Sequence, residues 1–381
     1  MYITEEHEMI RKTVRDFAER EIRPVAQELD EKGEFSPALT KKMGELGLFG
    51  LIAPVEYGGM NMDMLAYVIA VEELARVDSS QAATLAAHIS LGLGPILNYG
   101  TEEQKRKYLP MLTTGDALWA FGLTEPDAGS DSRATKTNAR RDGEHWIING
   151  SKIFITNGAS AINMGATVQV VSGEKNGKKE FTTILVDAGT PGFKRVPMHG
   201  KMMWRSSDTA ELYFDDCRVP CSNILGKQGE GSHIMLNTLD SGRLAIGAMG
   251  VGLAQGAFEA AFRYSKERKQ FGQPIGHFQI NAFKLADMAT KIELARTLLY
   301  KGAWLKANGK SFAKEAAMVK LYCSEIAREV ADEAVQIHGG YGLMKDYEVE
   351  RFYRDQRLLQ IGEGTSEIQR LVIARYIGVF D

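Results

Sequence analysis

The chain has 381 residues, of which 44% are hydrophobic and 25% charged, and its formal net charge is −3. This length predicts two or three domains or one large composite, and the composition is that of an ordinary globular protein. Basic residues show no clustered excess, which argues against a nucleic-acid-binding surface. Three cysteines are too few for a disulfide framework and fit a reducing compartment.

We expect no targeting segment, membrane span or metal site. Glu5, Glu6 and Glu8 make the N-terminus unlike a signal or transit peptide. The least polar stretch, 244–257, is shorter than the ~18 apolar residues that a span requires. The seven histidines are scattered, without the spacing of a metal site. The sequence therefore predicts a soluble, cytoplasmic protein without a metal.

Residues 1–115 carry a helical pattern. One face of a first helix is marked by apolar residues at helical spacing, namely Ile10, Val14, Phe17 and Ile22. Ser36-Pro37 has the form of an N-cap followed by proline at the first helical position. The segments 65–77 and 102–112 continue the pattern, so we predict an N-terminal helical domain.

Residues 116–228 have the pattern of strands. Trp146 to Phe154 reads as two short alternating runs around Asn149-Gly150, which predicts a β-hairpin turn at that pair. Further β-type runs cover 181–186 and 210–214, with Gly, Asp and Asn between them. These features predict a small antiparallel β domain.

Residues 229–381 return to longer helical patterns. Two apolar stripes mark them, one from Leu285 to Leu299 and one from Val319 to Ile337, and the second stops at Gly339-Gly340. The glycine-rich run 247–256 lacks the GxGxxG spacing and follows no strand, so it indicates close helix–helix contact rather than a nucleotide site. We predict a mainly α protein with a central β domain and a C-terminal helical bundle.

Two loops could carry chemistry. The turn-rich segment 121–131 offers successive backbone donors and hydroxyls that could hold a flat polar ring or a pyrophosphate. Near the C-terminus, Glu363 stands between Gly362 and Gly364, just before a helix that Ser366 could cap, with Gln369 closing a capping box. A carboxylate base beside free backbone N–H groups is what removal of a proton next to a carbonyl requires.

Together these segments resemble the acyl-CoA dehydrogenase family, flavoenzymes that desaturate acyl-CoA thioesters. The resemblance covers nearly the whole chain. Its motifs are the Thr-Glu-Pro-x-Ala-Gly-Ser-Asp loop at 124–131, the Ile-Asn-Gly-x-Lys-x-x-Ile-Thr-Asn-Gly segment at 148–158, Arg268-x-x-Phe271-Gly272 with Gln279, Gln336-Ile-His-Gly339-Gly340, and Glu363-Gly364-Thr365-Ser366-Glu367.

The resemblance implies an FAD site made by two subunits. Residues expected to bind the flavin and dinucleotide in their own subunit are Phe121, Leu123, Thr124, Gly129, Ser130, Phe154, Ile155, Thr156, Thr365 and Glu367. Residues expected to reach the FAD of a neighbouring subunit or its adenylate are Arg268, Phe271, Gln279, Gln336, Gly339 and Gly340. The resemblance also implies a homotetramer that passes electrons to an electron-transferring flavoprotein.

The resemblance further implies that Glu363 takes the α-proton of an acyl-CoA while a hydride leaves Cβ for flavin N5, giving a trans-2-enoyl-CoA. Substrate contacts are expected from Ser130, Asp240, Arg243, Gly362 and Gly364. The thioester oxygen would be polarised by a backbone amide of the Glu363-Gly364 segment and by a ribityl hydroxyl of FAD. Burial against the flavin would raise the pKa of the Glu363 carboxyl.

Departures from the family pattern bear on the substrate. Phe154 stands where many members have tryptophan, and Gly362 stands where straight-chain members commonly have tyrosine. The missing phenol predicts a wider pocket and a branched or alicyclic acyl group. Some relatives place the base at the position of Gly242, which has no side chain here, and glutarate-using relatives have an arginine near 83–90, where this chain has none.

Other functions remain open from the sequence. An enoyl-CoA reductase or an oxygen-using acyl-CoA oxidase would share the fold and the motifs. A non-catalytic binding or assembly protein is a third alternative, although such a role would not need Glu363.

Overall fold

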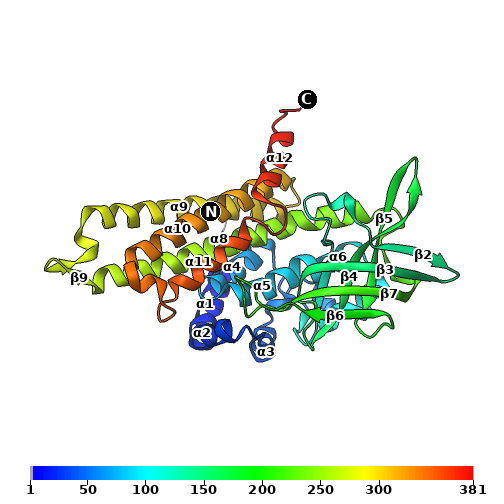
Figure 1. Cartoon of the computed structure of the whole chain (residues 1–381), viewed down its shortest axis with the longest axis horizontal. Helices are drawn as coiled ribbons and strands as arrows, with labels where there is room; N and C mark the ends of the chain where they lie inside the picture. The colour runs from blue at the N-terminus through cyan, green and yellow to red at the C-terminus, as the bar shows by residue number, and fades with distance from the viewer. Residues whose placement is uncertain (1–2, 381) are drawn as a thin grey trace.

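The computed structural model describes residues 3–380, in which helices from both ends of the chain form one bundle and a β-sheet lies at one end of it (Figure 1). α4 from the N-terminal part and α10 from the C-terminal part both pack on the long α8. The N-terminal helices are α1 Glu5–Phe17, α2 Arg23–Lys32, α3 Pro37–Glu45, α4 Met64–Ala75, α5 Ser79–Ala87, α6 Gly94–Tyr99 and α7 Glu102–Thr113.

Local capping explains where several of these helices begin. The Ser36 side chain accepts a hydrogen bond from the N–H of Leu39, with Pro37 at the first helical position, as the sequence predicts. α1 opens with a capping box made by Thr4 and His7. Short π-helical turns, Ala18–Ile22 and His88–Leu93, continue α1 and α5 without a break in the helical path.

The middle of the chain forms an eight-stranded sheet in the order β6-β7-β3-β2-β4-β5-β8, with β1 beside β4. The predicted antiparallel sheet is wrong in part, because the observed sheet is mixed. Most neighbouring strands are antiparallel, but β1 runs parallel to β4, and β2 runs parallel to β4 at the pair Asn138 and Val171. The strands are β1 Leu118–Gly122, β2 Asn138–Asp142, β3 His145–Thr156, β4 Asn163–Lys175, β5 Lys178–Asp187, β6 Phe193–Pro197, β7 Thr209–Pro220 and β8 Ile224–Leu225.

The predicted hairpin turn at Asn149-Gly150 is wrong. Both residues lie inside β3, where the pairing with β7 shifts register, and Gly150 has a φ of 140°. Asn149 exchanges two hydrogen bonds with Asp216 across the sheet, at 3.0 and 2.9 Å. A Cβ on Gly150 would lie 2.6 Å from the Cα of Thr137, so close strand packing rather than a turn requires this glycine. The β2–β3 turn comes earlier, between Asp142 and His145.

The C-terminal part is helical apart from a two-stranded hairpin. Its elements are α8 Gly231–Glu267, β9 Lys269–Gln270, β10 Gln273–Pro274, α9 Gln279–Ala307, α10 Ala313–His338, α11 Val349–Leu359 and α12 Ser366–Tyr376. The glycine-rich run lies on α8 and makes the predicted close contacts. A Cβ on Gly250 would lie 2.7 Å from the Cys323 carbonyl of α10, and one on Gly252 would lie 2.1 Å from the Glu72 carbonyl of α4.

α8 is long and apolar enough to cross a membrane by length and composition alone. However, 83% of its most apolar 18-residue window is buried inside the protein, as in the central helix of a packed bundle. The long glycine-rich helix is therefore accounted for by packing against α4 and α10.

Candidate active site

A cavity of about 450 Å³ is lined by residues of β1, β3, α5, α8 and the α11–α12 connection. The structure brings the end-loop carboxylate and the residues of the 121–131 loop to this one cavity. Predicted site residues that line it are Phe121, Leu123, Thr124, Gly129, Ser130, Phe154, Ile155, Thr156, Arg243, Gly362, Glu363, Gly364 and Thr365. Glu367 does not line it and lies exposed in the first turn of α12.

A buried ion pair holds the 121–131 loop against β3. Lys152 of β3 donates to Glu125 Oε1 at 2.7 Å and to the Leu123 carbonyl at 3.2 Å. Glu125 also accepts from the backbone N–H groups of Lys136 and Thr137. Burial lowers the pKa of Lys152 to about 8 although Glu125 opposes the shift. The loop is therefore fixed by a charge pair rather than by its own turn alone.

The end of β3 presents an aromatic ring and a hydroxyl to the cavity. Phe154 has a φ of 61°, in the left-handed region, and 64% of its surface is exposed. A bulky residue seldom adopts this conformation, and here it lets a large apolar ring stand on the cavity wall. Within residues 3–380, the side chain of Thr156 has no hydrogen-bond partner, so its hydroxyl is free for a ligand.

Glu363 places one carboxylate oxygen, Oε2, out of reach of solvent and without a hydrogen-bond partner among the described residues. Burial raises the pKa of this carboxyl to about 7, while Lys320 and then Arg243 oppose the shift. A carboxyl with a pKa near neutral in a cavity is suited to act as a general base.

The space for this carboxylate depends on Gly242 of α8. A Cβ at position 242 would lie 1.8 Å from Glu363 Oε2, which is closer than any two unbonded atoms can approach. The absence of a side chain at Gly242 is therefore a requirement for Glu363 in its present position.

The predicted capping box before α12 is wrong in its cap residue. Thr365, not Ser366, is the N-cap, because its backbone is not helical and its hydroxyl accepts from the N–H of Ile368 at 3.3 Å. Ser366 is already helical. Gln369 bonds instead to the carbonyls of Glu363 and Gly364, at 3.2 and 2.9 Å, and so secures the loop.

Arg243 supplies a cationic group to the cavity wall. It is 7% exposed and pairs with Asp240 one turn earlier on α8. Burial raises the pKa of Asp240, while Arg243 and Lys306 oppose the shift. Asp240 does not line the cavity itself, so it acts on the site only by pairing with Arg243.

The other predicted cofactor residues gather elsewhere, at the end of the bundle that carries β9 (Figure 1). Arg268, Gly339 and Gly340 line a separate hollow there, and the Arg268 guanidinium lies 5.5 Å from the centre of the Tyr341 ring. Phe271, at the tip of the β9–β10 hairpin, is 94% exposed, and Gln279 and Gln336 are exposed as well. One chain therefore does not bring these residues to the cavity of Glu363.

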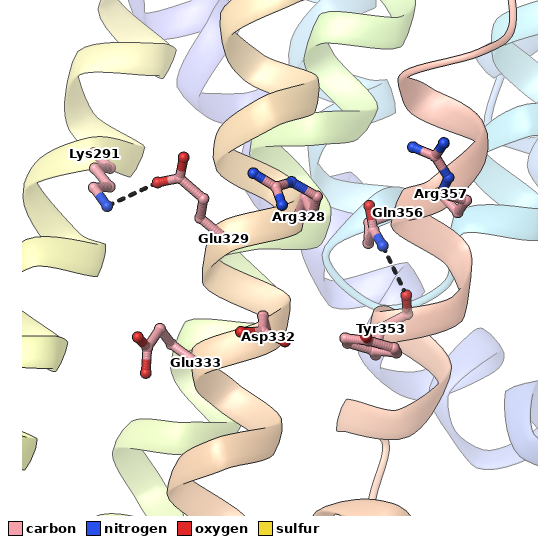
Figure 2. A pocket seen from close by; sticks show the side chains of 8 residues that line it. All are labelled: Lys291, Arg328, Glu329, Asp332, Glu333, Tyr353, Gln356 and Arg357. Atoms are coloured by element: carbon pink, nitrogen blue, oxygen red, sulfur yellow. Dashed lines mark hydrogen bonds and ion pairs between the residues drawn. The ribbon is translucent and has the colours of Figure 1, made fainter.

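A third hollow, between α9, α10 and α11, is polar (Figure 2). Three cationic and three anionic side chains line it, together with Tyr353 and Gln356. Lys291 pairs with Glu329 at 2.8 Å, so part of this charge is already neutralised within the hollow. It contains none of the predicted site residues.

Comparison with known proteins decides the family. Three family models match: the acyl-CoA dehydrogenase N-terminal domain at residues 4–116, the middle domain at 120–217 and the C-terminal domain at 229–378. The chain is a member of the acyl-CoA dehydrogenase family. It is 49% identical to a probable acyl-CoA dehydrogenase, YngJ, of Bacillus subtilis, over 98% of both chains.

Two further relatives of this acyl-CoA dehydrogenase family member bear on its chemistry. It is 46% identical to an acryloyl-CoA reductase (NADH) of Anaerotignum propionicum, over 98% of this chain and 95% of that one. The solved structure of butyryl-CoA dehydrogenase from Megasphaera elsdenii matches with a TM-score of 0.95 and 41% identity, over 98% of each chain. The predicted family and the mainly helical fold class with a central β part are confirmed, and so is the prediction of an enzyme over a non-catalytic protein.

FAD is the cofactor of this acyl-CoA dehydrogenase, as predicted. The cavity fits it, since an exposed aromatic ring, Phe154, and the free hydroxyl of Thr156 stand on the same wall. The 121–131 loop adds further backbone and hydroxyl groups to that wall.

Sequence reasoning missed several residues that build the acyl-CoA dehydrogenase site. Lys152 and Glu125 position the 121–131 loop, called the flavin loop from here on. Both residues lie inside the quoted motifs, and their opposite charges were the only sign in the sequence that they form a pair. Trp204, between β6 and β7, lines the cavity from a segment without a recognisable pattern. Lys320 lies on the helical stripe of α10 and gave no sign of a role beyond packing.

Proposed function

We propose that this enzyme oxidises the Cα–Cβ bond of a short acyl-CoA, with Glu363 as the base that removes the α-proton. The observation that carries the proposal is the Glu363 carboxylate, whose pKa is raised to about 7 and which stands in the cavity that the flavin loop lines. Arg243, beside it, is suited to contact a polar part of the CoA arm together with Asp240.

The protein must make the α-proton acidic enough for a carboxylate to remove. The backbone N–H of Glu363 finds no acceptor among residues 3–380, so it is available to a thioester oxygen. A donor placed where negative charge grows stabilises the transition state most strongly in a site that excludes water. FAD, when bound, accepts the hydride that leaves Cβ.

The acyl pocket is wide beside Glu363. Ala83, Ala86 and Ala87 of α5 and Gly362 all line the cavity, and each has a small side chain or none. A Cβ at Gly362 would lie 3.6 Å from the nearest atom of Leu358, so a side chain there would be accommodated and would take up cavity space. We therefore propose a short branched or alicyclic acyl group. The name of the butyryl-CoA dehydrogenase relative supports the short length.

A panel of acyl-CoA thioesters with an artificial electron acceptor tests the reaction and the pocket together. We expect branched or alicyclic short-chain thioesters to be turned over at least as well as butyryl-CoA. Gly362→Tyr should lower kcat/KM for the bulky thioesters at least about tenfold more than for butyryl-CoA. The added ring would occupy the space that the extra carbons need, and a misfit of even one methylene in an apolar pocket is worth about 1–3 kcal/mol. A clear straight-chain preference in the wild type, unchanged in Gly362→Tyr, would refute the proposed acyl group.

Electron-transferring flavoprotein is the proposed acceptor, and the family resemblance supports it. The acryloyl-CoA reductase relative makes enoyl-CoA reduction the second candidate, because the same carboxylate would return the α-proton in the reverse direction. An anaerobic assay with electron-transferring flavoprotein, NADH or oxygen as separate partners distinguishes dehydrogenase, reductase and oxidase.

A homotetramer is also proposed. Phe271, Gln279 and Gln336 are exposed in one chain and do not line the cavity of Glu363, as expected if they reach the FAD of a neighbouring subunit. The β9 end of the bundle lies opposite the end that carries the sheet (Figure 1). The cytoplasmic location stays a prediction.

A further inference from the structure

A lysine lies buried beneath the loop that carries Glu363. Lys320 of α10 is 0% exposed, and its Nζ donates to the Gly364 carbonyl at 2.7 Å. No carboxylate of the described residues lies within ion-pair distance of this ammonium. Burying a cation without a directly paired anion costs free energy. Packing alone therefore does not explain why a lysine stands beneath this loop.

The loop that Lys320 contacts has a demanding backbone conformation. Glu363 and Gly364 have φ values of 54° and 94°, two left-handed residues in succession. A residue other than glycine seldom adopts this conformation, because its Cβ then lies too close to the following carbonyl oxygen, so neighbouring groups must hold it. The Gly364 carbonyl receives two donors, a neutral one from Gln369 of α12 and a cationic one from Lys320.

The ammonium also acts on the carboxylate through space. Burial disfavours the charged form of Glu363, which is the form that can take a proton. Lys320 is the largest influence that opposes this effect, ahead of Arg243. The charge of Arg243 is already shared with Asp240, whereas that of Lys320 is not.

On the basis of the proposed function, we propose that Lys320 is a positioning residue for the base: its ammonium holds the Glu363-Gly364 turn through the Gly364 carbonyl and places a positive charge beneath the loop that carries the carboxylate. Lys320 does not line the cavity, so we expect it to contact neither substrate nor cofactor. It acts through Glu363.

Other charged and titratable groups surround the pair. Arg243 of α8 and Tyr67 of α4 interact with Glu363, and the pKa of the Tyr67 phenol is raised well above its ordinary value by burial, so it stays neutral. Glu367 of α12 and Glu325 of α10 face Lys320. Burial lowers the pKa of Lys320 to about 8, and Glu363 opposes that shift. The two groups therefore titrate as a coupled pair.

The test compares three variants of the FAD-loaded enzyme. Lys320→Met removes the charge and the donor, Lys320→Arg keeps the charge, and Gln369→Leu removes the neutral donor from the same carbonyl. The rate of anaerobic flavin bleaching by acyl-CoA is measured against pH. Infrared difference titration follows the Glu363 carboxyl directly, and its signal is identified by its loss in Glu363→Gln.

In Lys320→Met we expect the infrared titration of Glu363 and the acid limb of the bleaching rate to move together to higher pH, by about one pH unit or more, which corresponds to about tenfold in protonation equilibrium. Gln369→Leu should slow bleaching without moving either titration, because no charge is lost. Lys320→Arg should titrate at or below the wild-type pH. A Lys320→Met enzyme with both titrations unmoved would overturn the proposal.

If Lys320→Met does not fold, Lys320→Arg decides. A Glu363 titration raised by this substitution would contradict the role of the charge, and one at or below the wild-type pH supports it. The failure of the proposed function is distinguishable, because in that case Glu363→Gln would still bleach. If Glu363→Gln does not bleach and both titrations of Lys320→Met stay at the wild-type pH, the proposed role of Lys320 is wrong while the proposed function stands.

Discussion

At the scale of single residues, the site depends on one carboxylate and the space left for it. Gly242 and Glu363 come from parts of the chain 121 positions apart, yet a methyl group on the first would overlap an oxygen of the second. The same close approach explains why a base at position 363 and a side chain at position 242 exclude each other in this cavity.

Gly242→Ala tests this relation. The Cβ would lie 1.8 Å from Glu363 Oε2, so the carboxylate must move. A displacement of about 1 Å of a catalytic group can cost on the order of 10²-fold in rate, and we expect a loss of that size in bleaching rate with FAD still bound. Gly247→Ala on the same helix is the control, since its Cβ meets Val319 instead. Equal losses in both variants would show that helix packing, not the base, is responsible.

The sequence predicts some of these residues correctly and misses others. Glu363 and Gly242 could be assigned because their motifs are local and contiguous. The cap could not, because Thr365 and Ser366 are both good N-cap residues and the backbone decides between them. Lys320 could not be assigned either, since a lysine in a helical segment usually lies on the solvated face, whereas this one is buried.

At the scale of elements, β3 positions the flavin loop and α12 positions the base. β3 also shows where local pattern fails. Asn149-Gly150 has the composition of a tight turn, but packing against Thr137 and pairing with Asp216 keep the strand continuous. Tertiary contacts of this kind are absent from a single-strand pattern, whereas the helical stripes of α9 and α10 depend on periodicity and were predicted.

Glu125→Gln tests the element-scale account. It leaves the buried Lys152 without its charge partner, and breaking a buried pair typically costs about 3–5 kcal/mol. We expect a lower melting temperature and weaker FAD retention on gel filtration. Asp127→Asn in the same loop breaks an exposed pair with Lys136, which is worth about 0–1 kcal/mol, and should leave both unchanged. FAD retention in Glu125→Gln equal to that of the wild type would contradict the role of the pair.

At the scale of the whole molecule, one chain holds two separate groups of predicted cofactor residues. The cavity near the sheet holds the first group, and the end of the bundle with the β9–β10 hairpin holds the second (Figure 1). A single sequence does not indicate which residues meet within a chain and which meet between chains. The division into domains at 1–115, 116–228 and 229–381 also stays a prediction.

Phe271→Ser tests the assembly. Phe271 is 94% exposed, and within its own subunit its ring stands edge-on to Phe278 at 6.0 Å between centroids, so the substitution should leave the fold intact. If the residue covers FAD in a neighbouring subunit, the variant should lose FAD on dilution or form smaller species by light scattering. Val55→Ser, at a site 71% exposed on the N-terminal part, is the matched control. A yellow tetramer indistinguishable from wild type would count against the shared site.

The role of Glu363 as the base is tested by the pH dependence of anaerobic bleaching by a reactive acyl-CoA at subsaturating concentration. Only the ionised form of Glu363 can take the proton, and its pKa is raised to about 7 by burial. We expect a rate that falls below about pH 7 and levels off above it, with no bleaching by a yellow Glu363→Gln enzyme at any pH. Bleaching by Glu363→Gln at the wild-type rate would contradict it.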